Sequence, residues 1–342
     1  MSATLSISIA REGRRLSIRD RVASHPLVAF FLLAYGGAWL ALLPLMLAQN
    51  GLGVLPFHLP AFPFLVLASF AGPALSAVVI TRASEGNQGV RDLFRRYRPR
   101  RASYLWYLLA LYGPLLAIVA ITSLQLGGTP LAAIAGQPLV FFSAYSALML
   151  TSLPSGPLGE ELGWRGFALP RLQKAIGPFW GSLVLGVLWA GWHAPLFFLP
   201  DWKGSVSPLL IAVAFSSWVI PFTFIMTWVY NSAQGSTLAA TLMHAGENAA
   251  VALMAQQMLL VPGDFFLQAK VYGVLAIALI IATRGRLAVE KFRELPPVTF
   301  DQASAGERKR LTPRMIAIGV AAAAILAYVA VNLAYDAIHG MH

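Results

Sequence analysis

The amino-acid sequence predicts an all-α membrane protein, a polytopic bundle of about eight or nine transmembrane helices. Of its 342 residues, 58% are hydrophobic, whereas soluble domains contain about 45–50% apolar residues. Apolar stretches recur along the chain, and most reach the roughly 20 residues that a helix needs to cross a bilayer. Charged residues make up only 11% of the chain and gather between these stretches. The lipid bilayer is therefore the first predicted partner.

Nine stretches qualify as spans by length and apolar composition. They are residues 27–49, 59–81, 103–126, 131–153, 178–200, 208–230, 236–257, 265–283 and 313–335. The eighth contains Lys270, so the expected number is eight or nine. Pro154, Gly156 and Pro157 are expected to end the fourth span and to begin a separate, partly inserted helix.

The positions of lysine and arginine predict the orientation. Of the 25 basic residues, 23 fall in four stretches, at 1–25, 82–101, 165–174 and 284–314. Nine spans place all four stretches on one side, and basic loops favour the cytoplasm. We therefore predict a cytoplasmic N-terminus in an integral membrane protein of the bacterial plasma membrane.

Four regions are expected along the chain. A basic cytoplasmic tail at 1–25 precedes the transmembrane bundle at 26–284. The polar stretch 285–312, which contains two adjacent prolines, is expected to be a cytoplasmic linker. The last residues, 313–342, are expected to hold an additional transmembrane span.

Composition also excludes several classes of function. The chain has no cysteine, which excludes disulfides, thiolate metal sites and a cysteine nucleophile. The net charge of +11 could indicate a nucleic-acid partner. Because the arginines lie between apolar segments, they are explained as orientation signals, and no nucleic-acid partner is predicted.

Few ionisable side chains lie in or beside the spans, and the first group is in the sequence EELGWR. A charge at mid-bilayer costs at least about 2.5–3.5 kcal/mol, so each such group needs a partner. Glu161 and Arg165 are four residues apart and face each other on a helix. Glu160 is rotated by about 100° and is left over from that pair. The alternative is a helix end at the headgroups, with one salt bridge and one solvated glutamate.

Two further polar groups lie on other predicted spans. His193 follows Trp189 by one helical turn in LWAGWHAPLFF, and its alternative role is ordinary packing. His244 and Asn248 share a helix face in TLMHAGENAA, with Glu247 adjacent. A neutral imidazole and a carboxamide on one face are the donors that an oxyanion needs. Their alternative role is an interhelical hydrogen bond, but three groups on separate spans favour one shared site.

Together these residues resemble the three motifs of the CPBP intramembrane proteases. This family (CAAX protease and bacteriocin-processing, also called ABI) is related to the type II CAAX prenyl endopeptidases. Its pattern is EExxxR, FxxxH and HxxxN. The chain matches the first and third motifs in full and has Trp189 where phenylalanine is usual in the second. The resemblance covers a protease core at about residues 130–260.

The resemblance implies an intramembrane endopeptidase that cuts a peptide bond near the cytoplasmic leaflet. Glu160 is then the general base, and His193 is its partner on the water. His244 and Asn248 are the oxyanion donors, while Glu161 and Arg165 hold the geometry. The substrate is a peptide or a membrane protein, either prenylated in the CAAX manner or not.

Metal dependence has two possible answers at this point. The family has been described both as metalloproteases and as glutamate proteases. Glu160, His193 and His244 could supply a carboxylate–imidazole zinc site. Asn248 is a poor zinc ligand but a good oxyanion donor. We expect activation of water without a metal and no other cofactor.

Two other functions compete with proteolysis. A non-catalytic immunity or peptide-binding protein could use the same fold. A proton-coupled transporter could use the intramembrane glutamates and histidines as a relay. Transporters typically show inverted repeats or paired broken helices, and the sequence shows neither, so transport is the less favoured of the two.

Overall fold

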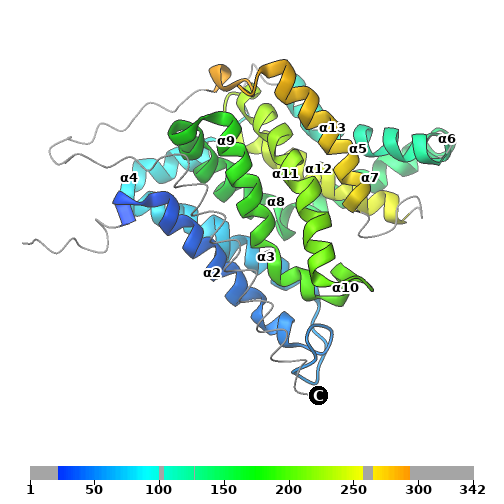
Figure 1. The fold of residues 1–342 in the computed structure, drawn as a ribbon, viewed down its shortest axis with the longest axis horizontal. Helices are drawn as coiled ribbons and strands as arrows, with labels where there is room; N and C mark the ends of the chain where they lie inside the picture. The colour runs from blue at the N-terminus through cyan, green and yellow to red at the C-terminus, as the bar shows by residue number, and fades with distance from the viewer. Residues whose placement is uncertain (1–21, 100–103, 127, 257–264, 293–342) are drawn as a thin grey trace, which may run out of the picture.

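A computed structural model describes residues 22–99, 104–126, 128–256 and 265–292 (Figure 1). All regular structure in these ranges is helical, and they contain no β-strand. The all-α prediction is therefore confirmed for them. The predicted last span, most of the predicted linker and most of the N-terminal tail lie outside the described residues.

Helices α2 (Pro26–Leu47), α3 (Ala61–Ser69) and α4 (Leu75–Arg95) form the N-terminal part of the bundle, with a π-helical turn, Phe70–Ala74, between the last two. Gly72 lets this turn approach α2 closely, because a Cβ on it would lie 2.7 Å from the backbone oxygen of Ala34. Small residues at such crossings allow helices to pack tightly within membranes.

The fourth predicted span is broken in two places. It divides into α6 (Thr129–Gly136) and α7 (Pro138–Ser152), so the continuous helix predicted at 131–153 is wrong. Pro138 lacks the N–H that a continuing helix would use and begins the new helix instead. At the other end, α7 gives way to a 3₁₀ turn, and α8 (Pro157–Glu161) begins as a separate helix. The predicted break at these prolines is confirmed.

Helix α8 continues through a π-helical segment, Leu162–Ala168, into α9 (Leu169–Trp192). Gly177 has φ +81° and breaks α9 in its interior, a backbone conformation that glycine adopts at little cost. The fifth predicted span thus starts where expected, but α9 ends at Trp192 and not at 200. A 3₁₀ turn, Ala194–Phe198, and the short α10 (Pro200–Lys203) follow.

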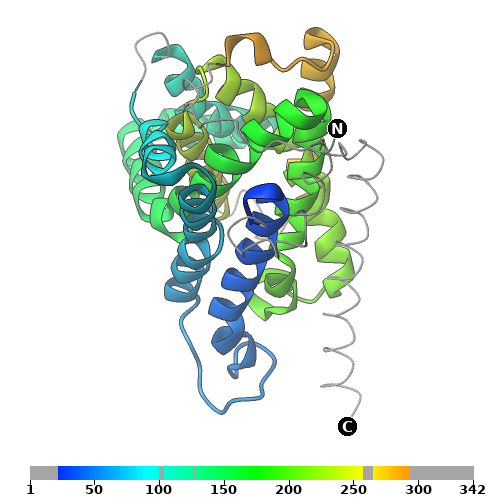
Figure 2. The same cartoon turned by 90° about the vertical axis from the view of Figure 1, so that its left-hand side faces the viewer.

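Helix α11 (Pro208–Ser232) lies between α9 and α13 (Phe265–Thr283). Helix α12 (Thr237–Gln256) packs against α7 and against α5 (Tyr104–Gln125). The loop after α2 lies at the lower end of Figures 1 and 2, and the described residues that follow α13, up to Phe292, lie at the upper end with the arginine-bearing end of α4. Two of the basic stretches are therefore at one end of the bundle, as the charge count predicts.

Five described helical segments are long and apolar enough to cross a membrane. They are Pro26–Leu47, Ala61–Arg95, Pro138–Ser155, Pro157–Trp192 and Pro208–Ser232. Leucines that are more than two-thirds exposed, such as Leu32, Leu40 and Leu105, point outward from the bundle. Large exposed apolar surfaces of this kind are typical of lipid contact. Several helices that are able to span a membrane are thus present, whereas the count of eight or nine and the side of the N-terminus stay predictions.

Candidate functional site

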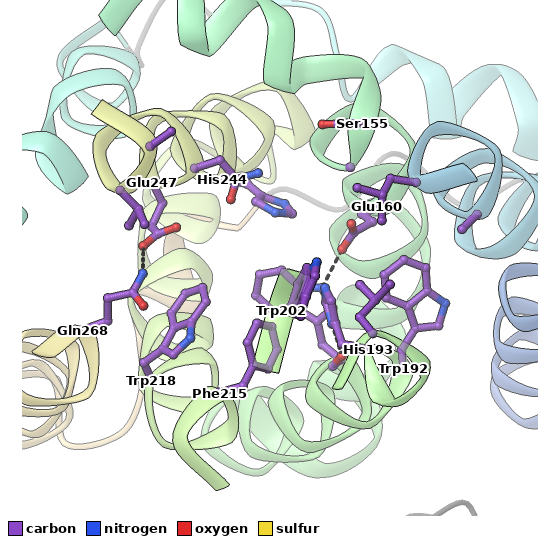
Figure 3. A pocket seen from close by; sticks show the side chains of 18 of the residues that line it. Ser155, Glu160, Trp192, His193, Trp202, Phe215, Trp218, His244, Glu247 and Gln268 are labelled. Atoms are coloured by element: carbon purple, nitrogen blue, oxygen red, sulfur yellow. Dashed lines mark hydrogen bonds between the residues drawn. The ribbon is translucent and has the colours of Figure 1, made fainter. Parts of the chain in front are cut away.

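A cavity of about 530 Å³ lies inside the bundle and is lined by residues of all three motifs (Figure 3). Glu160 comes from α8, Trp189 and His193 come from the end of α9, and His244 and Asn248 come from α12. Most of the remaining wall is apolar or aromatic. A concave, largely apolar site with a few converging polar groups is the usual form of a ligand site.

Glu161 and Arg165 lie beside this cavity as a fully buried ion pair. Arg165 Nη1 donates to both carboxylate oxygens of Glu161, at 2.8 and 3.0 Å, and both side chains are 0% exposed. The pair expected from the i,i+4 spacing is therefore present. It persists although the intervening residues are π-helical and not α-helical.

Glu161 also connects to the third motif. His244 Nδ1 is 2.9 Å from Glu161 Oε1, across 83 residues of chain. Sequence reasoning missed this contact, because only the packing of α12 against α8 brings the two side chains together. We call Arg165, Glu161 and His244 the ionic network.

Glu160 is held in a different way. The indole Nε1 of Trp189 donates to its Oε2 at 2.6 Å, and that of Trp164 donates to the same atom at 3.3 Å. Glu160 is 4% exposed, and among the described residues it has no ion pair with lysine or arginine. We call Glu160, Trp164 and Trp189 the indole-held carboxylate.

The second oxygen of Glu160 is the one left for a ligand. None of the residues with described positions donates a hydrogen bond to Oε1. Gly156 lies next to this atom, since a Cβ there would be only 2.8 Å from it. The missing side chain of Gly156 therefore provides room beside Oε1.

His193 directly follows Trp192, the last residue of α9, and faces the cavity in Figure 3. Its Nδ1 is 2.8 Å from the backbone oxygen of Trp189, which can only accept, so Nδ1 carries the proton. In the neutral ring, Nε2 then has a lone pair available. Trp192 and Phe215 pack against the imidazole, with ring centroids at 4.8 and 4.7 Å, and fix its orientation.

His244 and Asn248 are one turn apart on α12, and both line the cavity. Because His244 Nδ1 donates to the Glu161 carboxylate, Nε2 can donate to an oxyanion only when the ring is an imidazolium. The neutral ring expected from the sequence could not do so. The Glu161 carboxylate is placed to stabilise the charged ring.

Glu247 lies on the opposite side of the cavity from Glu160 in Figure 3. It is 2% exposed, and Gln268 Nε2 donates to its Oε1 at 2.6 Å. The sequence indicated only that Glu247 is adjacent to the His244 face. Its contact with Gln268 depends on how α13 packs, which no local pattern reveals.

The candidate zinc ligands, Glu160, His193 and His244, all line the cavity. Within the described part of the chain, no three His, Cys, Asp or Glu side chains are arranged so that they could hold a metal ion. Glu160, His193 and His244, as they are placed, therefore do not form a zinc site. No step below is routed through a metal, and the metal-free expectation stays a prediction.

Comparisons with known proteins agree with the motif assignment. Residues 139–250 match the family described as type II CAAX prenyl endopeptidase Rce1-like. A similar curated protein is CAAX prenyl protease 2 of Methanococcus maripaludis, which is 31% identical over 88 residues. The aligned region covers 25% of this chain and 32% of the relative, so the chain spans about a third of that protein's length. The resemblance recognised from the three motifs is thus confirmed: the segment 139–250 is similar to the type II CAAX prenyl endopeptidases.

Proposed function

We propose that this protein is an intramembrane endopeptidase that hydrolyses a peptide bond with water activated by Glu160 and His193. One observation carries the proposal: polar residues of three motifs, far apart in the sequence, line a single cavity. Most other buried polar side chains of the described residues are serine, threonine, asparagine or glutamine.

Glu160 has the features of a general base. Its Oε2 is occupied by two indole N–H groups, while Oε1 is left for a water molecule. His193 Nε2 accepts a hydrogen bond from the same water, because Nδ1 is the protonated nitrogen. The water transfers a proton to Glu160 as its oxygen attacks the carbonyl carbon. Glu160 then returns this proton to the leaving amine, which completes the hydrolysis.

His244 and Asn248 are suited to stabilise the negative oxygen of the tetrahedral intermediate. Both residues come from α12 and line the cavity, which supports the proposal that an imidazolium Nε2–H and an amide N–H donate to the same oxyanion. Such preorganised donors are often the largest single contribution to acyl-transfer catalysis. The ionic network supports the charged form of His244, since Glu161 contacts both His244 and Arg165.

The substrate is proposed to be a peptide or the tail of a membrane protein. The matched relative is named a CAAX prenyl protease, so a prenylated CAAX-type tail is the first candidate to test. Tyr97, just beyond the arginine-bearing end of α4, donates to the backbone oxygen of Leu158 at 2.8 Å. Burial raises the pKa of Tyr97, so its hydroxyl stays protonated as a donor. This contact joins α8, the helix that carries Glu160, to the end of α4 that is predicted to be cytoplasmic. It therefore supports the proposal that cleavage occurs near the cytoplasmic leaflet.

A proteomic comparison tests the proposal. Membranes that contain the wild-type protein are compared with membranes that contain Glu160→Gln, and peptides cut only in the former are identified. Glu85→Gln is the matched control, because Glu85 is a half-exposed glutamate that pairs with Arg171. If His193→Ala, His244→Ala and Glu160→Gln all retain full biological activity, the non-catalytic peptide-binding or immunity role replaces this one.

A further inference from the structure

Trp189 contacts all three motifs, although it is the one position at which the chain departs from the pattern it resembles. Its indole N–H donates to Glu160 at 2.6 Å, and its backbone oxygen accepts from His193 at 2.8 Å. Its ring packs edge-on to His244, with centroids 5.1 Å apart. The guanidinium of Arg165 lies 4.4 Å from the centre of a Trp189 ring. The side chain is only 1% exposed.

The indole N–H matters because no lysine or arginine of the described ranges forms an ion pair with Glu160. Arg165 Nη1, the nearest candidate, donates to Glu161. Hydrogen bonds between N–H groups and carboxylates are short and about twice as strong as neutral ones. At 2.6 Å the bond from Trp189 is the shorter of the two that reach Glu160, since that from Trp164 is 3.3 Å. Phenylalanine, usual at this position, has no donor.

The bond also determines which carboxylate oxygen faces a ligand. Both indoles donate to Oε2, which leaves Oε1 beside Gly156 without a donor among the described residues. A carboxylate without such bonds could rotate and exchange its two oxygens. A rigid neighbour that engages one oxygen removes this freedom and preorganises the other.

We propose that Trp189 is a positioning residue that holds Glu160 by its indole N–H, so that Oε1 is the oxygen presented to water. This inference rests on the proposed function only in assigning a water molecule to Oε1. The hydrogen bond itself can be tested without any substrate. Replacement by phenylalanine keeps an aromatic ring against His244 and Arg165 and removes the donor.

The first experiment detects the hydrogen bond directly. The chain has nine tryptophans, and their indole N–H signals are recorded by NMR on ¹⁵N-tryptophan-labelled full-length protein in micelles. Trp189→Phe identifies the Trp189 signal by its loss. Glu160→Gln removes the negative acceptor, so the proton signal of Trp189 is expected to move upfield. The Trp39 signal is expected to stay in place, because that indole donates to the backbone oxygen of Trp192.

An unmoved Trp189 signal in Glu160→Gln would overturn the proposal. If Trp189→Phe does not fold, Glu160→Gln still decides the question. The expected result is then a shift confined to two indole signals, those of Trp189 and Trp164. A spectrum in which fewer than two indole signals move would overturn the proposal.

The second experiment measures cleavage of an internally quenched, farnesylated CAAX-type peptide. Trp189→Phe is expected to lower kcat roughly ten- to hundredfold, the range for a hydrogen bond to a charged group, and to leave KM within about twofold. Trp180→Phe, which removes a half-exposed indole that does not line the cavity, is the control and keeps the wild-type kcat.

The outcomes separate this inference from the proposed function. If the wild type cuts the peptide and Trp189→Phe cuts it equally well, the positioning role is wrong and the protease remains. If the wild type does not cut it, cleavage of this CAAX-type peptide is not supported. The NMR result then decides by itself whether Trp189 holds Glu160.

Discussion

Two adjacent glutamates of one short helix, Glu160 and Glu161, are held by different kinds of contact: neutral indole N–H groups for the first and ionic groups for the second. Glu161 belongs to the ionic network and lies away from the cavity, between the positive Arg165 and the ring of His244. Glu160 is the indole-held carboxylate and lines the cavity; among the residues that the structure describes, only neutral indole N–H groups donate to it. A buried charge with a well-placed counterion supports structure, and breaking the pair is costly. A carboxylate without a counterion keeps more capacity to accept a proton.

The largest expected effect comes from breaking the ionic network. Arg165→Met leaves Glu161 buried without its cation, which is expected to destabilise the fold by about 3–5 kcal/mol. The yield of monodisperse protein and its thermal unfolding in detergent measure this loss. Arg171→Met is the control, because the ion pair of Arg171 with Glu85 is partly exposed, and such pairs contribute at most about 1 kcal/mol. Equal losses in both variants would mean that the ionic network stabilises the fold no more than a partly exposed ion pair does.

Glu160→Gln is expected to lower activity and to leave the stability of the fold unchanged, the converse of Arg165→Met. Gln keeps a carbonyl oxygen that can accept from Trp189 but cannot act as a base. We expect peptide cleavage to fall by about 10²- to 10⁴-fold, while thermal stability stays close to that of the wild type. Cleavage assays and unfolding curves on the same preparation provide the measurement. A variant that unfolds as readily as Arg165→Met would mean that both glutamates are structural.

Gly156→Ala is expected to have a smaller effect on activity. The added Cβ would lie 2.8 Å from Glu160 Oε1 and push the carboxylate from its position. A displacement of this kind is expected to lower kcat about tenfold to a hundredfold. Gly36→Ala is the matched control, since nothing lies within 4 Å of its added Cβ. Unchanged cleavage by Gly156→Ala would show that the position of Oε1 is not critical.

Removal of metal ions is expected to leave cleavage unchanged. Glu160 Oε2 accepts from the indoles in place of a cation, and no metal-binding group of three side chains is found in the described part of the chain. Elemental analysis and cleavage assays before and after chelation measure the requirement. Stoichiometric zinc, with activity lost to the chelator and restored by zinc, would contradict the metal-free mechanism.

Labelling of single cysteines tests the orientation of the protein in the membrane. The cysteine substitutions themselves are expected to leave the fold unchanged. The chain has no cysteine, so Arg91→Cys and Val54→Cys each introduce one exposed thiol. A membrane-impermeant thiol reagent is expected to label position 54, in the loop after α2, in intact cells and position 91 only in inverted vesicles. The reverse pattern would put the arginine-bearing end of α4, and with it Tyr97, on the non-cytoplasmic side.

Local sequence rules predicted features that depend on one helix. The i,i+4 spacing predicted the ion pair between Glu161 and Arg165, which is present. Pro154 and Pro157 predicted the break before α8, because proline lacks an N–H and ends a helix. The break at Pro138 follows the same rule and was missed, because the apolar run continues through it and composition carries no information on helix continuity.

Contacts between distant helices could not be predicted in this way. That His244 contacts Glu161, that Gln268 contacts Glu247 and that Trp189 donates to Glu160 depend on which helix faces pack together. Many packings bury the same apolar area, so hydropathy does not select among them. The tautomers of His193 and His244 are likewise set by acceptors from the fold.

The sequence by itself determined that the chain is a helical membrane protein, and which few polar residues had to find partners. The physical reason is that the cost of charge in hydrocarbon applies at every position, whatever the fold. Only the tertiary structure decided which partner each residue found. Glu161 is paired with Arg165 and His244, whereas Glu160 is held by two indoles at the cavity. Adjacent residues on a helix point in different directions, and the neighbouring helices decide what each one meets.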